Sequence, residues 1–148
     1  MSQERAPFGL PFPTAKLPKK ILIVEDHVDA RHMLTLALRK LGFEVHGTAS
    51  SAAALKAVQE KKPDVVLLDI GLADGPNGLL VCEKIKAENA PISPYVVITS
   101  GHKSKEVIQE AQRLGANAYL VKPFRLSRLL EIVAAADVTS KDFIVEWQ

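Results

Sequence analysis

Four apolar runs, separated by segments with helical spacing, dominate the hydrophobic pattern of this 148-residue chain. They lie at residues 21–24, 65–68, 95–98 and 118–121. Near-continuous apolar runs of this length are typical of parallel strands that are buried on both faces of a sheet. A weaker alternation of apolar and polar residues at 43–47 predicts a further strand nearer the sheet edge. The pattern therefore predicts five strands.

The segments between these strands carry apolar residues at the i, i+3, i+4 spacing of amphipathic helices. Ser50 or Ser51 and Ser104 are candidate N-caps, and Gly42 and Gly115 are candidate helix ends. The apolar positions that mark the five predicted helices are Ala30, Met33, Leu34, Ala37, Leu38 and Leu41; Leu55 and Val58; Val81, Cys82 and Ile85; Val107, Ile108, Ala111 and Leu114; and Leu126, Leu129, Leu130 and Val133.

Alternating strands and helices predict an α/β fold with a doubly wound, five-stranded parallel sheet and five helices. The expected strand order is the flavodoxin-like 2-1-3-4-5. Residues 20–136 form the predicted domain, after a flexible, proline-rich leader at 1–19. Residues 137–148 remain as a C-terminal tail, too short for an output domain.

Every long apolar run ends on polar residues. Glu25 and Asp26 follow the first run, Asp69 the second, Thr99 the third and Lys122 the fourth. In an open α/β sheet, ligands bind in the crevice outside the carboxyl ends of the strands. Three acids, a hydroxyl and a lysine therefore converge on one edge, which suits a divalent metal ion and a phosphoryl group.

The chemistry of these side chains fits phosphoryl transfer to a carboxylate. Asp69 can act as the nucleophile and form an acyl phosphate, while Mg²⁺ held by carboxylates neutralises the approaching charges. Lys122 and Thr99 can contact phosphoryl oxygens. Each residue also has a plainer explanation, as a turn residue, helix cap or exposed strand end. The plainer explanations must each hold independently, whereas a phosphoryl-transfer site accounts for all of these positions together. The occurrence of all five residues therefore favours the site.

Composition and charge narrow the possibilities. A net charge of +2 without a basic cluster does not favour nucleic acid as a partner. The single cysteine, Cys82, allows no intrachain disulfide, and no apolar run is long enough to span a membrane. We expect a cytoplasmic protein that binds neither nucleic acid nor membrane.

The segments ILIVED, VVLLD, VVITS and YLVKPF resemble, in order and spacing, the receiver domain of two-component response regulators over residues 20–136. The resemblance implies that Asp69 accepts a phosphoryl group from a sensor histidine kinase or a histidine phosphotransfer protein. It also implies that Glu25, Asp26 and Asp69 hold Mg²⁺, together with the backbone carbonyl of Gly71.

The resemblance further assigns the switch residues. Thr99 matches the hydroxyl that moves toward the phosphate, Lys122 the phosphate-binding lysine, and Tyr119 the aromatic residue whose rotamer reports activation. Family spacing favours Thr99 over the adjacent Ser100, because only one of two successive strand residues can face the site. The Lys122–Pro123 peptide bond is cis in this family.

We therefore predict a stand-alone receiver, a signalling domain that promotes only its own phosphorylation and dephosphorylation. Its downstream protein target would bind the surface of the fourth helix, fifth strand and fifth helix, and the chain would be a monomer or weak homodimer. The alternative is a pseudo-receiver, a binding scaffold that is not phosphorylated.

The sequence argues against two other classes of protein. A phosphatase of the haloacid dehalogenase type needs a second aspartate at the position of Gly71. A nucleotide-binding module needs a phosphate-binding loop at the position of the acidic Glu25-Asp26.

The tail is unusually apolar for a chain end, with Phe143, Ile144, Val145 and Trp147. Two explanations remain open: the tail packs on the domain, or it forms a surface for a partner or a second copy.

Overall fold

The computed structural model describes residues 20–71, 78–90 and 93–146. The predicted leader at 1–19 lies outside these ranges, as does Trp147. In chain order the elements are β1 (Lys20–Val24), α1 (Val28–Lys40), β2 (Glu44–Thr48), α2 (Ser51–Lys61), β3 (Val65–Asp69), α3 (Gly78–Glu88), β4 (Tyr95–Ser100), α4 (Lys105–Arg113), β5 (Ala118–Val121), α5 (Leu126–Ala134) and β6 (Ile144–Glu146).

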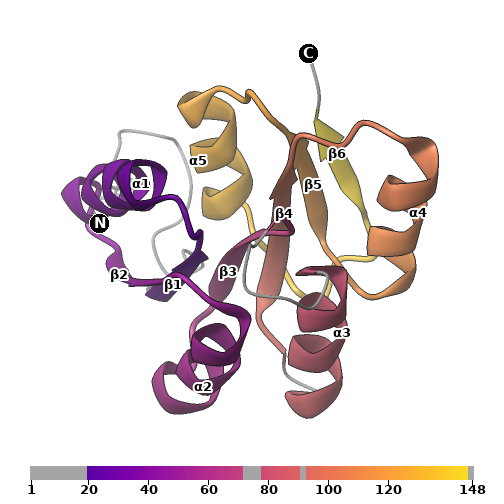
Figure 1. Cartoon of the computed structure of the whole chain (residues 1–148), viewed down its shortest axis with the longest axis horizontal. Helices are drawn as coiled ribbons and strands as arrows, with labels where there is room; N and C mark the ends of the chain where they lie inside the picture. Colours follow the sequence, from indigo (N-terminus) through magenta and orange to yellow (C-terminus); the bar gives the residue numbers. More distant parts are fainter. Residues whose placement is uncertain (1–19, 72–77, 91–92, 147–148) are drawn as a thin grey trace, which may run out of the picture.

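The strands form one parallel sheet with the order β2-β1-β3-β4-β5-β6 (Figure 1). This confirms the doubly wound, flavodoxin-like fold and the predicted order of the first five strands. The sixth strand was not predicted. Residues 144–146 belong to the segment assigned to a separate tail, and they pair with β5 as the outermost strand. Because β6 has only three residues, it is too short to show a strand pattern in the sequence.

Two apolar layers enclose the sheet. On one side, alternate strand residues such as Leu22, Val66 and Tyr119 pack with residues of α2, α3 and α4. On the other side, their strand neighbours pack with residues of α1 and α5. Both faces of the central strands are therefore covered, and this explains why the strands read as continuous apolar runs rather than alternating ones.

Local signals in the sequence place the helix ends. The Ser50 and Ser104 side chains accept hydrogen bonds from the N–H groups of Ala53 and Val107, which confirms both N-caps. Gly42 and Gly115 follow α1 and α4 with φ angles of 101° and 100°, a conformation that favours glycine.

Helix α1 departs from the predicted pattern at Met33. The apolar spacing groups this residue with the face that packs on the sheet, but its side chain is exposed. No helix of the described residues is long and apolar enough to cross a membrane.

Candidate functional site

Strand alternation brings the candidate residues to one side of the sheet. Glu25, Asp69, Thr99 and Lys122 each stand two residues beyond a strand residue of the layer that faces α1 and α5. The backbone register pairs Asp69 directly with Thr99. Since side chains two apart along a strand share a face, all four functional groups gather at the carboxyl edge of this layer.

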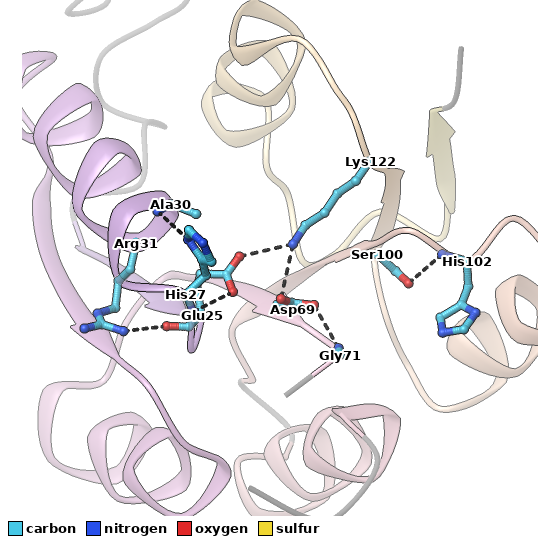
Figure 2. Close-up of polar contacts among 9 residues, drawn as sticks. All are labelled: Glu25, His27, Ala30, Arg31, Asp69, Gly71, Ser100, His102 and Lys122. Carbon is cyan, nitrogen blue, oxygen red and sulfur yellow. Dashed lines mark hydrogen bonds and ion pairs between the residues drawn. The ribbon is translucent and has the colours of Figure 1, made fainter. Parts of the chain in front are cut away.

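Lys122 connects the two central acids. Its Nζ donates to Glu25 Oε1 at 3.1 Å and to Asp69 Oδ2 at 3.2 Å (Figure 2). Both carboxylates are almost wholly buried, whereas the lysine side chain remains about a third exposed. The ammonium group therefore compensates for the hydration that the two carboxylates lose when they are buried.

The buried acids perturb one another. Burial, followed by contact with Asp69, raises the pKa of Glu25 above its ordinary value. Burial alone would also raise the pKa of Asp69, but hydrogen bonding with Glu25 and Gly71 and the charge of Lys122 together lower it. For the cationic Lys122, burial has the opposite effect and would lower the pKa, but the negative charges of Glu25 and Asp69 raise the pKa above its usual range. The site therefore keeps Asp69 ionised and available as a nucleophile.

The backbone near Asp69 orients its carboxylate. The Gly71 N–H donates to Asp69 Oδ1 at 2.8 Å, so each carboxylate oxygen of Asp69 has a donor of its own. The Ile70 N–H donates to the carbonyl of Thr99, which extends the β3–β4 ladder one residue past Asp69. Asp69 is thus held from both sides at the end of a central strand.

Arg31 holds the loop that carries the other two acids. Its guanidinium donates to the backbone carbonyl of Glu25 at 2.8 Å (Figure 2), and its aliphatic carbons lie against Gly47. A Cβ atom on Gly47 would stand 3.2 Å from the Arg31 Cδ, so the absence of a side chain there makes room for the arginine. Sequence reasoning did not identify Arg31, because the contact depends on β2 lying beside α1.

Two side chains hold the loop after β4: Ser100 at the end of β4 and Tyr119 on β5. The Ser100 Oγ accepts the His102 N–H at 3.0 Å, so this hydroxyl faces away from Asp69 (Figure 2). The Tyr119 hydroxyl donates to the His102 carbonyl at 2.9 Å. Thr99 lies on the Asp69 side of the strand and Ser100 on the other.

Glu25, Asp26 and Asp69 lie close enough together to hold one divalent cation. One carboxylate oxygen from each of Glu25, Asp26 and Asp69 lies within 4.8 Å of the others. Carboxylate oxygens are the preferred ligands of Mg²⁺, which keeps several waters when it binds to proteins. The donor set and its spacing therefore fit this ion.

Comparison with known families decides the identity of the domain. The family model of the response regulator receiver domain matches residues 21–134. The chain belongs to this receiver family. The match covers all five helices and the strands β1 to β5, of which only Lys20, the first residue of β1, lies outside it. Strand β6 also lies outside the match.

Two relatives of the receiver domain are named as a DNA-binding response regulator and a transcriptional regulatory protein. The DNA-binding response regulator MtrA of Mycobacterium tuberculosis is 36% identical over 117 residues, which are 79% of this chain and 50% of that protein. The transcriptional regulatory protein PdtaR of the same species is 32% identical over 123 residues, or 82% of this chain and 58% of PdtaR. The chain thus spans about half the length of these relatives.

Solved structures show the same receiver architecture. A two-component response regulator from Clostridium difficile superposes with a TM-score of 0.74 and 27% identity, covering 79% of this chain and 93% of that one. A CheY-like receiver domain protein from Methanospirillum hungatei superposes with a TM-score of 0.72 and 28% identity. The superposition covers 78% of this chain and 90% of that one. Two-component signalling and the receiver fold are therefore common to this chain and its relatives.

Each residue that the sequence assigned to the receiver site has a defined place. Glu25, Asp26, Asp69 and Lys122 meet at the carboxyl edge, with Thr99 paired to Asp69 and the Gly71 N–H on its carboxylate. Tyr119 lies on the opposite face of the sheet and reaches the loop after β4. The Lys122–Pro123 peptide bond is cis, as the resemblance implied.

Proposed function

We propose that this receiver domain is a phosphorylation switch that accepts a phosphoryl group on Asp69 from a sensor histidine kinase or a histidine phosphotransfer protein. The observation that carries the proposal is the environment of Asp69. An ionised, buried carboxylate at the end of β3 lies beside two further acids and within 3.2 Å of the Lys122 ammonium. This combination supplies a nucleophile, ligands for a cation and a positive charge for the incoming phosphate.

The proposed transfer needs no separate base. A carboxylate oxygen of Asp69 attacks the phosphorus of a phosphohistidine, and a P–O bond forms as the P–N bond breaks. The electron pair of the broken bond stays on the imidazole nitrogen of the donor. Lys122, which contacts Asp69 in the free domain, would turn to an oxygen of the transferred group. Positioning and charge neutralisation supply most of the catalysis in such reactions.

Mg²⁺ would be held by Glu25, Asp26 and Asp69, together with the backbone carbonyl of Gly71. When bound, this ion supplies positive charge that lets the anionic carboxylate and phosphate approach each other. The residues of the chain do the remaining work. Arg31 fixes the Glu25 carbonyl and with it the acid-bearing loop, and the Gly71 N–H orients the Asp69 carboxylate.

The switch would run from Asp69 through Thr99 to Tyr119. Movement of the Thr99 hydroxyl toward the phosphate would shift the loop after β4, to which the Tyr119 hydroxyl is bonded. Phosphate would thereby favour one of two arrangements of the domain and of the protein-binding face near α4, β5 and α5. Because β6 covers the outer edge of β5, a target on this face would also meet β6.

Helix α1 offers a docking surface for the phosphodonor protein. Its side chains Val28, Met33 and Leu36 are 63%, 62% and 54% exposed, and the helix begins two residues after Asp26. Exposed apolar side chains next to a reactive centre are typical of a protein-binding site.

We expect Met33→Glu to slow transfer from a phosphorylated histidine phosphotransfer protein but not from acetyl phosphate, with Val138→Glu as a matched control. Equal slowing with both donors would contradict docking on α1.

A cytoplasmic location and an output through protein contacts belong to this proposal. The relatives named as DNA-binding are about twice as long as the matched region. That this chain acts without nucleic acid and as a monomer or weak homodimer remains a prediction.

Binding of beryllofluoride, a phosphoryl mimic, tests the proposal against the scaffold alternative. We expect amide resonances near Asp69, Thr99 and Lys122 to shift when beryllofluoride and Mg²⁺ are added together. Asp69→Asn should abolish these shifts and leave the fold unchanged. Identical spectra of the wild type with and without both ligands would favour a scaffold that is not phosphorylated.

A further inference from the structure

We propose that β6 is part of the switch, because Val145 on this strand holds the Tyr119 side chain in its buried orientation. The parallel register makes Val145 the direct neighbour of Tyr119 across the β5–β6 ladder. Register partners in parallel strands point to the same face of the sheet. Val145 therefore lies on the side of the sheet where the Tyr119 ring packs.

Tyr119 is wholly buried even though β5 would be the edge strand of a five-stranded sheet. Its ring belongs to the layer that faces α2, α3 and α4, and Phe143 packs against the same layer. Without β6, the outer side of this ring would border solvent at the sheet edge, and the side chain could rotate past it. The chain's own C-terminal segment closes that path.

Several contacts fasten β6 in this position. The Ile144 N–H donates to the Asn117 carbonyl at 3.2 Å, and Ile144 packs against the layer that faces α1 and α5. At the other end of the strand, Glu146 forms an ion pair with Arg128 of α5 at 3.2 Å. Both faces and both ends of this short strand are therefore tied to the domain.

The consequence for phosphate binding rests on the proposed function. If the buried tyrosine belongs to the arrangement that phosphate favours, β6 prepares the domain for phosphorylation. A domain in which fewer molecules have the buried tyrosine should bind a phosphoryl mimic more weakly, in proportion to the lost fraction. Val145 would then be a positioning residue that acts through Tyr119 and touches neither phosphate nor metal.

Fluorine NMR of the full chain with 3-fluorotyrosine tests the inference. The chain has two tyrosines, and Tyr119→Phe assigns their signals. We expect Val145→Gly to increase relaxation of the Tyr119 signal by a soluble gadolinium chelate, about twofold or more if roughly half of the molecules turn the ring outward. Val138→Gly is the matched control, because Val138 is 46% exposed in the same segment, compared with 37% for Val145.

Glu146→Gln is the second variant. It removes the charge paired with Arg128 and should produce a smaller increase in the same signal. A Tyr119 signal that stays as protected as in the wild type in both variants would overturn the inference, and so would an equal increase in Val138→Gly.

Beryllofluoride affinity separates this inference from the proposed function. We expect Val145→Gly to weaken binding about twofold if half of the buried population is lost, and Val138→Gly to leave it unchanged. An exposed Tyr119 with unchanged affinity would overturn the link to Asp69. Failure of the wild type to bind would refute the proposed function alone, because the fluorine measurement needs no phosphate.

Discussion

At the residue scale, the site contains two buried carboxylates that repel each other. Glu25 and Asp69 are both buried and share a single ammonium group, that of Lys122. Burial and the neighbouring aspartate raise the pKa of Glu25, so the ionised form of this residue makes the folded domain less stable. A cation among the three acids would relieve this repulsion. The cation that the proposed function needs would therefore also stabilise the site.

We expect Glu25→Gln to stabilise the metal-free domain at neutral pH by on the order of 1 kcal/mol. The folded pKa of Glu25 lies above the unfolded one, so the folded state binds more protons between the two values. Stability is consequently lost as the pH rises through this window, and glutamine avoids that loss. Urea unfolding at pH 7 and pH 4 without Mg²⁺ measures the difference. The gap should close at the lower pH, and a variant less stable than the wild type at pH 7 would contradict the account.

At the scale of elements, close packing at the end of β3 constrains where α3 begins. Gly78, the first residue of α3, lies so close to the end of β3 that a Cβ atom there would stand 2.4 Å from the Ile70 Cα. The obstruction is backbone, which cannot rotate aside as a side chain can. Gly78 therefore lets α3 begin directly beside the strand that carries Asp69.

Gly78→Ala should destabilise the domain by about 1–3 kcal/mol, because α3 must move away from β3. Gly101→Ala is the matched control, since a Cβ at that position meets no atom within 4 Å. Thermal unfolding of both variants provides the comparison. Equal midpoints for the two would show that α3 and β3 have room that the structure does not indicate.

At the scale of the whole molecule, the sequence predicted the parts of the fold that depend on long, repeated patterns. The four apolar runs and the weaker alternation at 43–47 predicted the first five strands, and the flavodoxin-like arrangement predicted their order. The polar residues that end the runs predicted that Glu25, Asp69, Thr99 and Lys122 converge. The features that were missed depend on contacts between segments far apart in the chain. Arg31 meets Gly47 only because β2 pairs with β1, and β6 has three residues whose pairing depends on Asn117 and Arg128. Such short or single contacts leave no periodic signal.

The proposed function depends on the phosphorylation of Asp69 in a reaction that needs Mg²⁺. The most direct test is the intact mass of the protein after incubation with acetyl phosphate, with Asp69→Asn treated in parallel. We expect one added phosphoryl group on the wild type, no addition on Asp69→Asn, and loss of the wild-type adduct when Mg²⁺ is chelated beforehand. An adduct that forms equally on Asp69→Asn, or without Mg²⁺, would contradict the account.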